Sequence, residues 1–201
     1  MQAEEFLALR HGTGPTPPVT QVRSTLIVSA IQTFRARGLH AHYLETLGPD
    51  LRERIVSLIA GQWIPVELAI EHYRAADGLG FDPATIDAIG GEVADRVSKS
   101  SLSIMVKMSK SVGVTPWTGL SNAHRLNDIN WRGGDVRVWK LGPKDARFDW
   151  HGQPCARVPY FVISFGGFLR ALASLFCTKA YTRVQSDHCS PTSISYRLSW
   201  A

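Results

Sequence analysis

The chain has 201 residues, of which 44% are hydrophobic and 19% are charged. This length suits one domain with a buried core, and the composition argues against a disordered chain or a coiled coil. The formal net charge of +5 is uneven, since residues 1–95 carry 7 Lys or Arg against 12 Asp or Glu. The basic residues of the back half are scattered rather than clustered along a phosphate track, so we expect no nucleic-acid partner.

The compartment follows from what the sequence lacks. No apolar run reaches the roughly 18–20 uncharged residues that a membrane span needs. The start, MQAEEFLALRHG, has no basic region followed by an apolar stretch, as a secretory signal would. Three cysteines are too few for a disulfide framework. We therefore expect a cytoplasmic protein with no membrane span.

The first residues predict a tail ahead of a single domain. Residues 10–20, RHGTGPTPPVT, hold three prolines and two glycines, a composition typical of an extended linker. We therefore expect a flexible tail over residues 1–21 and one domain over residues 22–201.

The front half of that domain predicts helices. Apolar residues recur at helical spacing over 26–34, 51–59 and 66–73. Asp82 and Pro83 form a start signal for a long helix that we expect to run to about Val112. Inside that helix, Gly90 and Gly91 indicate a close helix contact or a kink.

One more helix and then a change of period follow. A Thr-Pro pair at 115–116 precedes a helix whose apolar face is predicted to hold Leu120, Ala123, Leu126 and Ile129. Asp135–Leu141 and Ala146–His151 read as two antiparallel strands joined by a Gly-Pro turn.

The rest of the back half predicts a helix and two more strands. Tyr160–Cys177 is nearly all apolar with one charge, Arg170. We expect it to be a helix buried on most sides against a sheet rather than a membrane span, because glycines interrupt it and strands follow. Ala180–Ser186 reads as a strand, and residues 194–200 alternate apolar with polar, which indicates a half-buried strand with its polar side chains outward.

These elements together predict an α+β fold. The order is helices followed by β-β-α-β-β, so a helical N-terminal half is expected to pack on a small antiparallel sheet of about four strands.

This order and four short stretches resemble a known superfamily. The stretches are GGEVADRV at 90–97, WKLGPKDARFDWHG at 139–152, GGFLRALASLFC at 166–177 and VQSDHCSPTSISYRLSW at 184–200. The chain is similar to the 4-vinyl-reductase-type domains, the haem-dependent nitric-oxide-binding domains and the TRAPP vesicle-tethering subunits. It most resembles a myxobacterial-type family of proteins of about this length.

The resemblance implies a binding module rather than an enzyme. In that superfamily the pocket lies between the helical part and the sheet, and the modules are commonly dimeric. Haem in the nitric-oxide sensors is held with a proximal His and a Tyr-x-Ser-x-Arg motif, which the string at 193–197 does not reproduce. Zinc in some of the reductase-type sensors is held by C-terminal cysteines. Haem and zinc are therefore alternatives here rather than expected cofactors.

Aromatic residues of the second half are the candidate pocket. Ligand pockets are mostly apolar, and tryptophan offers a large apolar face with one N–H donor. We predict that the pocket is lined by side chains from the helix before the sheet and from the apolar helix: Trp117, His124, Trp131, Phe161, Phe165 and Phe168.

A metal site is the weaker candidate. Cys177, His188 and Cys189 bring two thiols and an imidazole close in sequence. Zinc usually takes four ligands in paired spacing, and that spacing is missing. No paired carboxylates, nucleophile motif or phosphate-binding loop can be assembled either, so we expect no catalytic residues.

The sequence thus predicts a non-enzymatic sensory module that binds a small apolar or aromatic molecule between helices and sheet. We expect it to act as a homodimer or with a partner signalling protein. The alternatives are a scaffold for protein interactions without a ligand and a haem-based gas sensor.

Overall fold

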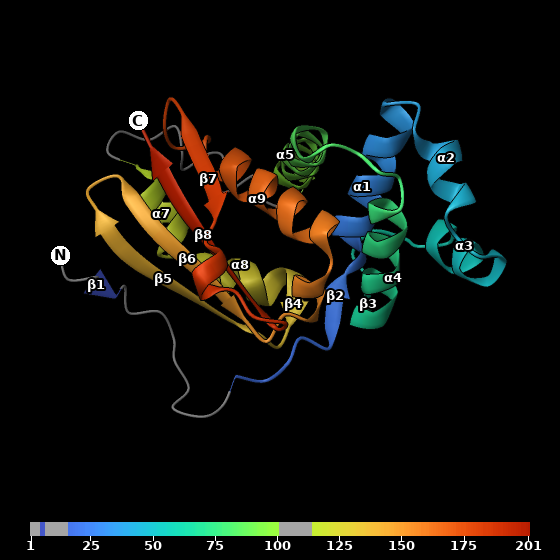
Figure 1. The fold of residues 1–201 in the computed structure, drawn as a ribbon, viewed down its shortest axis with the longest axis horizontal. Coiled ribbons are helices and arrows are strands. Elements are labelled where there is room, and N and C mark those ends of the chain that lie inside the picture. The colour runs from blue at the N-terminus through green and yellow to red at the C-terminus, as the bar shows by residue number, and fades with distance from the viewer. Residues whose placement is uncertain (1–4, 7–15, 101–113) are drawn as a thin grey trace.

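The structure is a computed structural model that describes residues 5–6, 16–100 and 114–201. It holds mixed helices and antiparallel sheets, so the predicted α+β class is confirmed. Figure 1 shows three layers: a sheet, the helix α9 (Pro159–Ala173) against it, and the front helices beyond α9. Of the front helices, the one at 83–100 makes the main contact with α9, the one at 24–36 packs on that helix, and α9 in turn covers the sheet.

The front helices follow the predicted periodicity, with one addition. The described elements are α1 (Ser24–Ala36), α2 (His40–Glu45), α3 (Pro49–Val56), α4 (Val66–Asp77) and α5 (Pro83–Ser100). The short α2 was not predicted. The expected extension of α5 to Val112 lies outside the described residues.

The helix predicted after Pro116 is two helices. α7 (Pro116–Leu120) and α8 (Ala123–Asn130) are separated by a turn at 121–122. The prediction that Ile129 faces the core is wrong, since its side chain is 49% exposed. Ala123 and Leu126 on the same helix line the interior, and Ile129 lies six residues after Ala123, about 240° further around the helix, so it turns away from them.

The main sheet has five described strands rather than four. Its order is β1-β5-β6-β8-β7, all antiparallel. The strands are β1 (Glu5–Phe6), β5 (Asp135–Gly142), β6 (Asp145–His151), β7 (Ala180–Val184) and β8 (Ser193–Trp200). The hairpin and the last strand lie where the sequence placed them, while β1 was not predicted.

A second sheet of three very short strands was also missed. β2 (Gln21–Arg23) pairs with β3 (Trp63–Pro65) on one side and with β4 (Trp131–Arg132) on the other. Val22 is fully buried on the inner face, opposite Ile64 and Trp131. This sheet joins the start of α1 to the end of α8.

The predicted tail boundary at residue 22 lies too late. Val19 is 2% exposed, and its N–H donates to the Gly152 carbonyl at 2.7 Å. The Gly134 N–H donates to the Pro17 carbonyl at 2.8 Å. Residues 17–21 therefore belong to the domain, because they supply hydrogen bonds and apolar packing to its loops.

One glycine from each helix, Gly90 on α5 and Gly167 on α9, brings the two backbones into contact. A Cβ on Gly90 would lie 1.8 Å from the Ser164 carbonyl oxygen, and a Cβ on Gly167 would lie 2.0 Å from the Asp87 carbonyl oxygen. The close helix contact predicted from the glycines of α5 is confirmed. An ion pair between Arg170 and Asp87 flanks the contact.

The helix α9 ends at Ala173 rather than Cys177. Among the described residues, no helix combines the length and the apolar character required to cross a bilayer. In α9 the buried residues include Tyr160, Phe161, Gly166 and Gly167. Most other side chains of this helix are only partly buried.

Candidate functional site

The inner face of the main sheet forms one wall of the candidate site. The side chains that alternate inward are apolar: Val136 and Val138 on β5, Phe148 and Trp150 on β6, and Ile194, Tyr196 and Leu198 on β8. Strand alternation places them on one face, and α8 and α9 cover that face. The site therefore lies between two helices and a sheet, and it is partly open at the surface.

An apolar cavity of about 60 Å³ lies in this enclosure, and we call it the seam cavity. α8, the sheet and α9 supply most of its wall, and α1 adds one residue. The lining residues are Leu26, Ala123, Leu126, Asn127, Asn130, Trp131, Val136, Phe148, Trp150, Phe165, Phe168, Leu169 and Leu172. Apart from two asparagines and the indole N–H groups, the lining offers only apolar surface.

Two smaller cavities adjoin the seam cavity. One of about 40 Å³ lies towards α1, α4 and α5, and it shares Trp131, Phe165 and Phe168 with the seam cavity. Another of about 50 Å³ lies towards α7 and shares Ala123 and Leu126. The three cavities thus follow one another along α9, and only side chains separate them.

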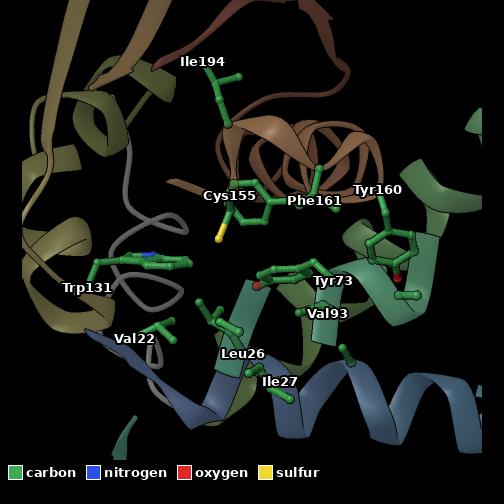
Figure 2. Close-up of a cluster of buried hydrophobic side chains, with 14 of the residues drawn as sticks. Val22, Leu26, Ile27, Tyr73, Val93, Trp131, Cys155, Tyr160, Phe161 and Ile194 are labelled. Carbon is green, nitrogen blue, oxygen red and sulfur yellow. The ribbon is translucent and has the colours of Figure 1, made fainter. Parts of the chain in front are cut away.

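Aromatic rings in contact with one another fill the space between the cavities. The ring centroids of Trp150 and Phe165 are 4.7 Å apart, those of Trp131 and Trp150 are 5.0 Å apart, and those of Phe161 and Phe165 are 5.6 Å apart. Figure 2 shows Trp131 and Phe161 reaching towards each other from α8's end and from α9, with Tyr73 and Leu26 below them. Rings in such contact stabilise the core beyond the area that they bury.

Four of the six predicted pocket residues lie at these cavities. Trp131, Phe165 and Phe168 line both the seam cavity and its neighbour towards α1, and Phe161 lines that neighbour. Their role in binding a ligand stays a prediction.

The other two predicted residues lie elsewhere. Trp117 packs edge-on against Trp200 at 4.9 Å and donates its indole N–H to the Pro143 carbonyl. His124 is on α8 but lines none of the three cavities, and its Nδ1 is buried without a hydrogen-bond partner. The sequence placed both on one helix, which the structure divides into α7 and α8, and it could not give the direction of each side chain.

Trp150 was the most informative residue that the sequence reasoning missed. It is 1% exposed and contacts Trp131, Phe161 and Phe165. The alternation of 146–151 already put Phe148 and Trp150 on one strand face. The alternation therefore grouped these two aromatic side chains correctly. It could not say which face of the strand points to the interior of the protein.

The proposed metal ligands are not brought together. Cys177 and Cys189 lie before and after β7, and each thiol donates to a backbone carbonyl, that of Ala173 and that of Gln185 respectively. His188 is exposed. The part of the chain that the structure describes contains no group of three His, Cys, Asp or Glu side chains suited to a metal ion.

Buried polar groups in the front half form a separate cluster. The Tyr43 hydroxyl and the His72 Nδ1 share a hydrogen bond of 2.7 Å in a fully buried setting. Burial lowers the pKa of His72 to about 3, so the imidazole is neutral. In the back half, burial raises the pKa of the Cys155 thiol, just before α9, so this cysteine stays protonated and is a poor nucleophile.

A polar network occupies the outer face of the main sheet. The carboxylate of Asp149 accepts hydrogen bonds from the Ser195 hydroxyl at 2.6 Å, the Trp139 indole at 2.7 Å and the Arg147 Nε at 3.1 Å. Ser195 lies on the outer face, as the alternation predicts, but it is fully buried there rather than exposed. Its partner is in another strand, which the alternation of β8 alone does not reveal.

Comparison with known proteins gives fold relatives only. No family model and no curated protein matches the sequence. The chain folds like an H-NOX domain. A structure of the Fe(II) unliganded H-NOX protein from K. algicida matches with a TM-score of 0.63 and 7% identity, over 89% of this chain and 96% of that one.

Two further solved structures agree. An oxygen-binding H-NOX domain related to soluble guanylate cyclases matches with a TM-score of 0.58 and 10% identity, over 89% of this chain and 94% of that one. A mutant of the T. tengcongensis H-NOX matches with a TM-score of 0.57 and 12% identity, over 89% and 97%. These likenesses support the haem-nitric-oxide part of the expected resemblance. Its 4-vinyl-reductase and TRAPP parts find no support here.

Proposed function

We propose that this chain is a non-enzymatic sensory domain that binds a small apolar molecule in the seam cavity. The seam cavity is the observation that carries the proposal. Its walls are apolar and it lies between helices and sheet, and pockets that bind small molecules are lined mostly by side chains of this kind. The similarity to H-NOX folds supports a sensory role.

The signal would leave the cavity through Trp131. This side chain lines the seam cavity, while its strand β4 is hydrogen-bonded to β2, which leads directly into α1. A guest that moves the indole therefore moves the three-stranded sheet and the start of α1. Homodimerisation or docking of a signalling partner would read out that movement.

The test is binding of xenon, a spherical apolar probe. We expect saturable shifts in the methyl NMR signals of Leu126, Leu169 and Leu172, which line the cavity. Ala123→Val adds two methyl groups to the wall and should abolish those shifts, while Ala84→Val, the same change at an exposed position of α5, should not. Absence of saturable shifts in the wild-type protein would refute the proposal.

A haem-based gas sensor is the competing proposal, because the structural relatives are H-NOX domains. The residues present do not fit haem. Pockets for drug-sized ligands have volumes of about 300–1,000 Å³, whereas the seam cavity has about 60 Å³ and is bounded by packed rings. His124, the histidine on α8, does not reach any of the three cavities.

Absorption spectroscopy separates the two proposals. After incubation with hemin and removal of the excess, we expect no Soret band beyond that of free hemin. A stoichiometric band that His124→Ala removes would instead establish the haem sensor and overturn the apolar-ligand proposal.

A further inference from the structure

The three-stranded sheet has an outer face as well as a buried one. Val22, Ile64 and Trp131 are buried on its inner face, and Figure 2 shows Val22 and Trp131 turned towards the aromatic core. Because successive side chains of a strand point to opposite sides, their neighbours lie on the outer face. These neighbours are all exposed or partly exposed: Gln21 and Arg23 on β2, Trp63 and Pro65 on β3, and Arg132 on β4.

Two arginines of this outer face lie against one indole ring. The Arg23 Cζ is 4.2 Å from the centre of the Trp63 ring, and the Arg132 Cζ is 4.4 Å from it. Since β2 lies between β3 and β4, the Arg132 side chain crosses the middle strand to reach Trp63. Guanidinium groups are attracted to the faces of aromatic rings. The indole therefore holds two positive charges at one place on the surface.

The described part of the chain does not neutralise these charges. Arg23 donates to the carbonyls of Gly61 and Ile129, and no described carboxylate lies within salt-bridge distance of either guanidinium. Among the described residues, the Arg132 side chain and the Trp63 indole N–H have no hydrogen-bond acceptor, and the indole nitrogen is not a buried atom. The outer face thus presents positive charge and unused donors.

Two large apolar side chains are exposed beside this face. Ile59 is 67% exposed and Ile129 is 49% exposed. The Ile59 carbonyl accepts from the Ser24 hydroxyl at 2.6 Å, and the Ile129 carbonyl accepts from the Arg23 Nε at 3.3 Å. The junction of β2 with α1 therefore holds both isoleucines next to the charged face.

This combination fits a protein segment better than a nucleic acid. Tryptophan and arginine carry much of the binding energy at protein interfaces. Guanidinium groups bind carboxylates through paired hydrogen bonds, and exposed isoleucines gain free energy when an apolar side chain covers them. A nucleic acid needs a track of several Lys and Arg residues along its phosphates, whereas this face holds two cations flanked by apolar surface.

We infer that the outer face of the three-stranded sheet docks an acidic segment of a partner protein, and that this segment also carries an apolar side chain. Its carboxylates would accept from Arg132 and the Trp63 indole, and its apolar side chain would cover Ile59 and Ile129. The docking face needs no ligand in the seam cavity, so it goes beyond the proposed function. Only its regulation rests on that function, since Trp131, the residue before Arg132, lines the seam cavity.

The test uses a synthetic peptide with blocked ends, EEELLEEE, as the probe. Titration of the whole chain at about 150 mM salt, where charges more than about 8 Å apart are screened, should give a saturable NMR shift of the Trp63 indole N–H. The peptide EEEGGEEE has the same charge but lacks the leucines. It should bind about threefold more weakly or worse, because the apolar contact is lost.

Variants at two exposed positions of the face separate charge from apolar contact. Arg132→Glu should weaken binding of EEELLEEE about tenfold, since an attraction becomes a repulsion. Ile129→Ser should weaken EEELLEEE about threefold and leave EEEGGEEE unchanged. Arg183→Glu and Val184→Ser make the same changes at exposed positions of β7, and they should leave both affinities within about twofold.

Three results would overturn the inference. One is the absence of a saturable shift with EEELLEEE. Another is an equal loss of affinity in Arg132→Glu and Arg183→Glu, which would mean attraction to net charge alone. The third is binding of an eight-nucleotide polyuridine RNA as tightly as EEELLEEE, which would assign the face to nucleic acid. None of these changes the outcome of the xenon experiment, so failure of the docking face and failure of the seam cavity are distinguishable.

Discussion

The two sides of α9 are built on opposite principles. Towards α5, glycines let backbone touch backbone, so that not even a methyl group fits at Gly90 or Gly167. Towards α8 and the sheet, large rings such as Phe165 and Trp150 meet, and gaps remain between them. Backbone contact cannot be repacked by changing rotamers, whereas rings can shift. The glycine side therefore sets the position of α9, and the aromatic side leaves room for a guest.

The largest expected effect comes from adding a methyl group on the glycine side. Gly90→Ala places a Cβ 1.8 Å from the Ser164 carbonyl oxygen, so the helices must separate. We expect a loss of about 4 kcal/mol or more in the free energy of unfolding, the range of severe overpacking. Urea unfolding followed by circular dichroism measures it.

Gly142→Ala is the matched control for that change. A Cβ there meets only the Asp145 Cβ at 3.6 Å, an ordinary contact. It should cost less than about 1 kcal/mol. Equal stability of the Gly90→Ala protein and the wild type would mean that α5 and α9 do not touch as described.

The next prediction concerns the front helices, where His72 should make the free energy of unfolding depend on pH. The pKa of His72 is about 3 in the folded protein because burial disfavours the charged form, and the ordinary value is 6.5. Above pH 6.5 the imidazole is neutral in both the folded and the unfolded chain, so this residue does not lower the free energy of unfolding there. As the pH falls from there towards 3, the unfolded chain takes up a proton that the folded chain refuses. Stability should therefore fall by about 1.4 kcal/mol per pH unit through this group.

A variant isolates that contribution from those of other groups. His72→Gln removes the titration, so its unfolding free energy should depend less steeply on pH between 6.5 and 3. Chemical denaturation at several pH values gives both slopes. Parallel slopes would show that His72 is not buried as a neutral group.

The smallest effect is expected on the aromatic side. Phe165→Leu leaves a smaller apolar residue where rings already leave gaps, and it should cost about 1–2 kcal/mol. It also enlarges the seam cavity, so xenon should bind more tightly than to the wild type. Phe34→Leu, within the front core and away from the seam cavity, is the control that should lose stability without a gain in xenon affinity.

Local patterns were enough to predict most of the elements. The helical spacing of α1 and α4, the hairpin of β5 and β6 and the alternation of β8 are each contained within one stretch of sequence. The three-stranded sheet was missed because strands of two or three residues are too short to show a period. The burial of Ser195 was missed because its cause, Asp149, is on a neighbouring strand.

The candidate site was predictable only in part, for a related reason. Composition pointed to Trp131, Phe165 and Phe168, since aromatic residues gather where helices meet a sheet. Leu26 and Asn127 were missed because nothing in their own neighbourhood marks them as cavity residues. They reach the site only when α1 and α8, about a hundred residues apart, come together.

The three-stranded sheet also has a consequence for the order of folding. Its strand β2 pairs Val22 with Ile64 and with Trp131, residues that are far apart along the chain. Closing such long loops costs chain entropy that only a few backbone hydrogen bonds repay, so pairings of this kind form slowly. We expect the hairpin and the helices to assemble first. Pairing of this small sheet is then the last step of folding.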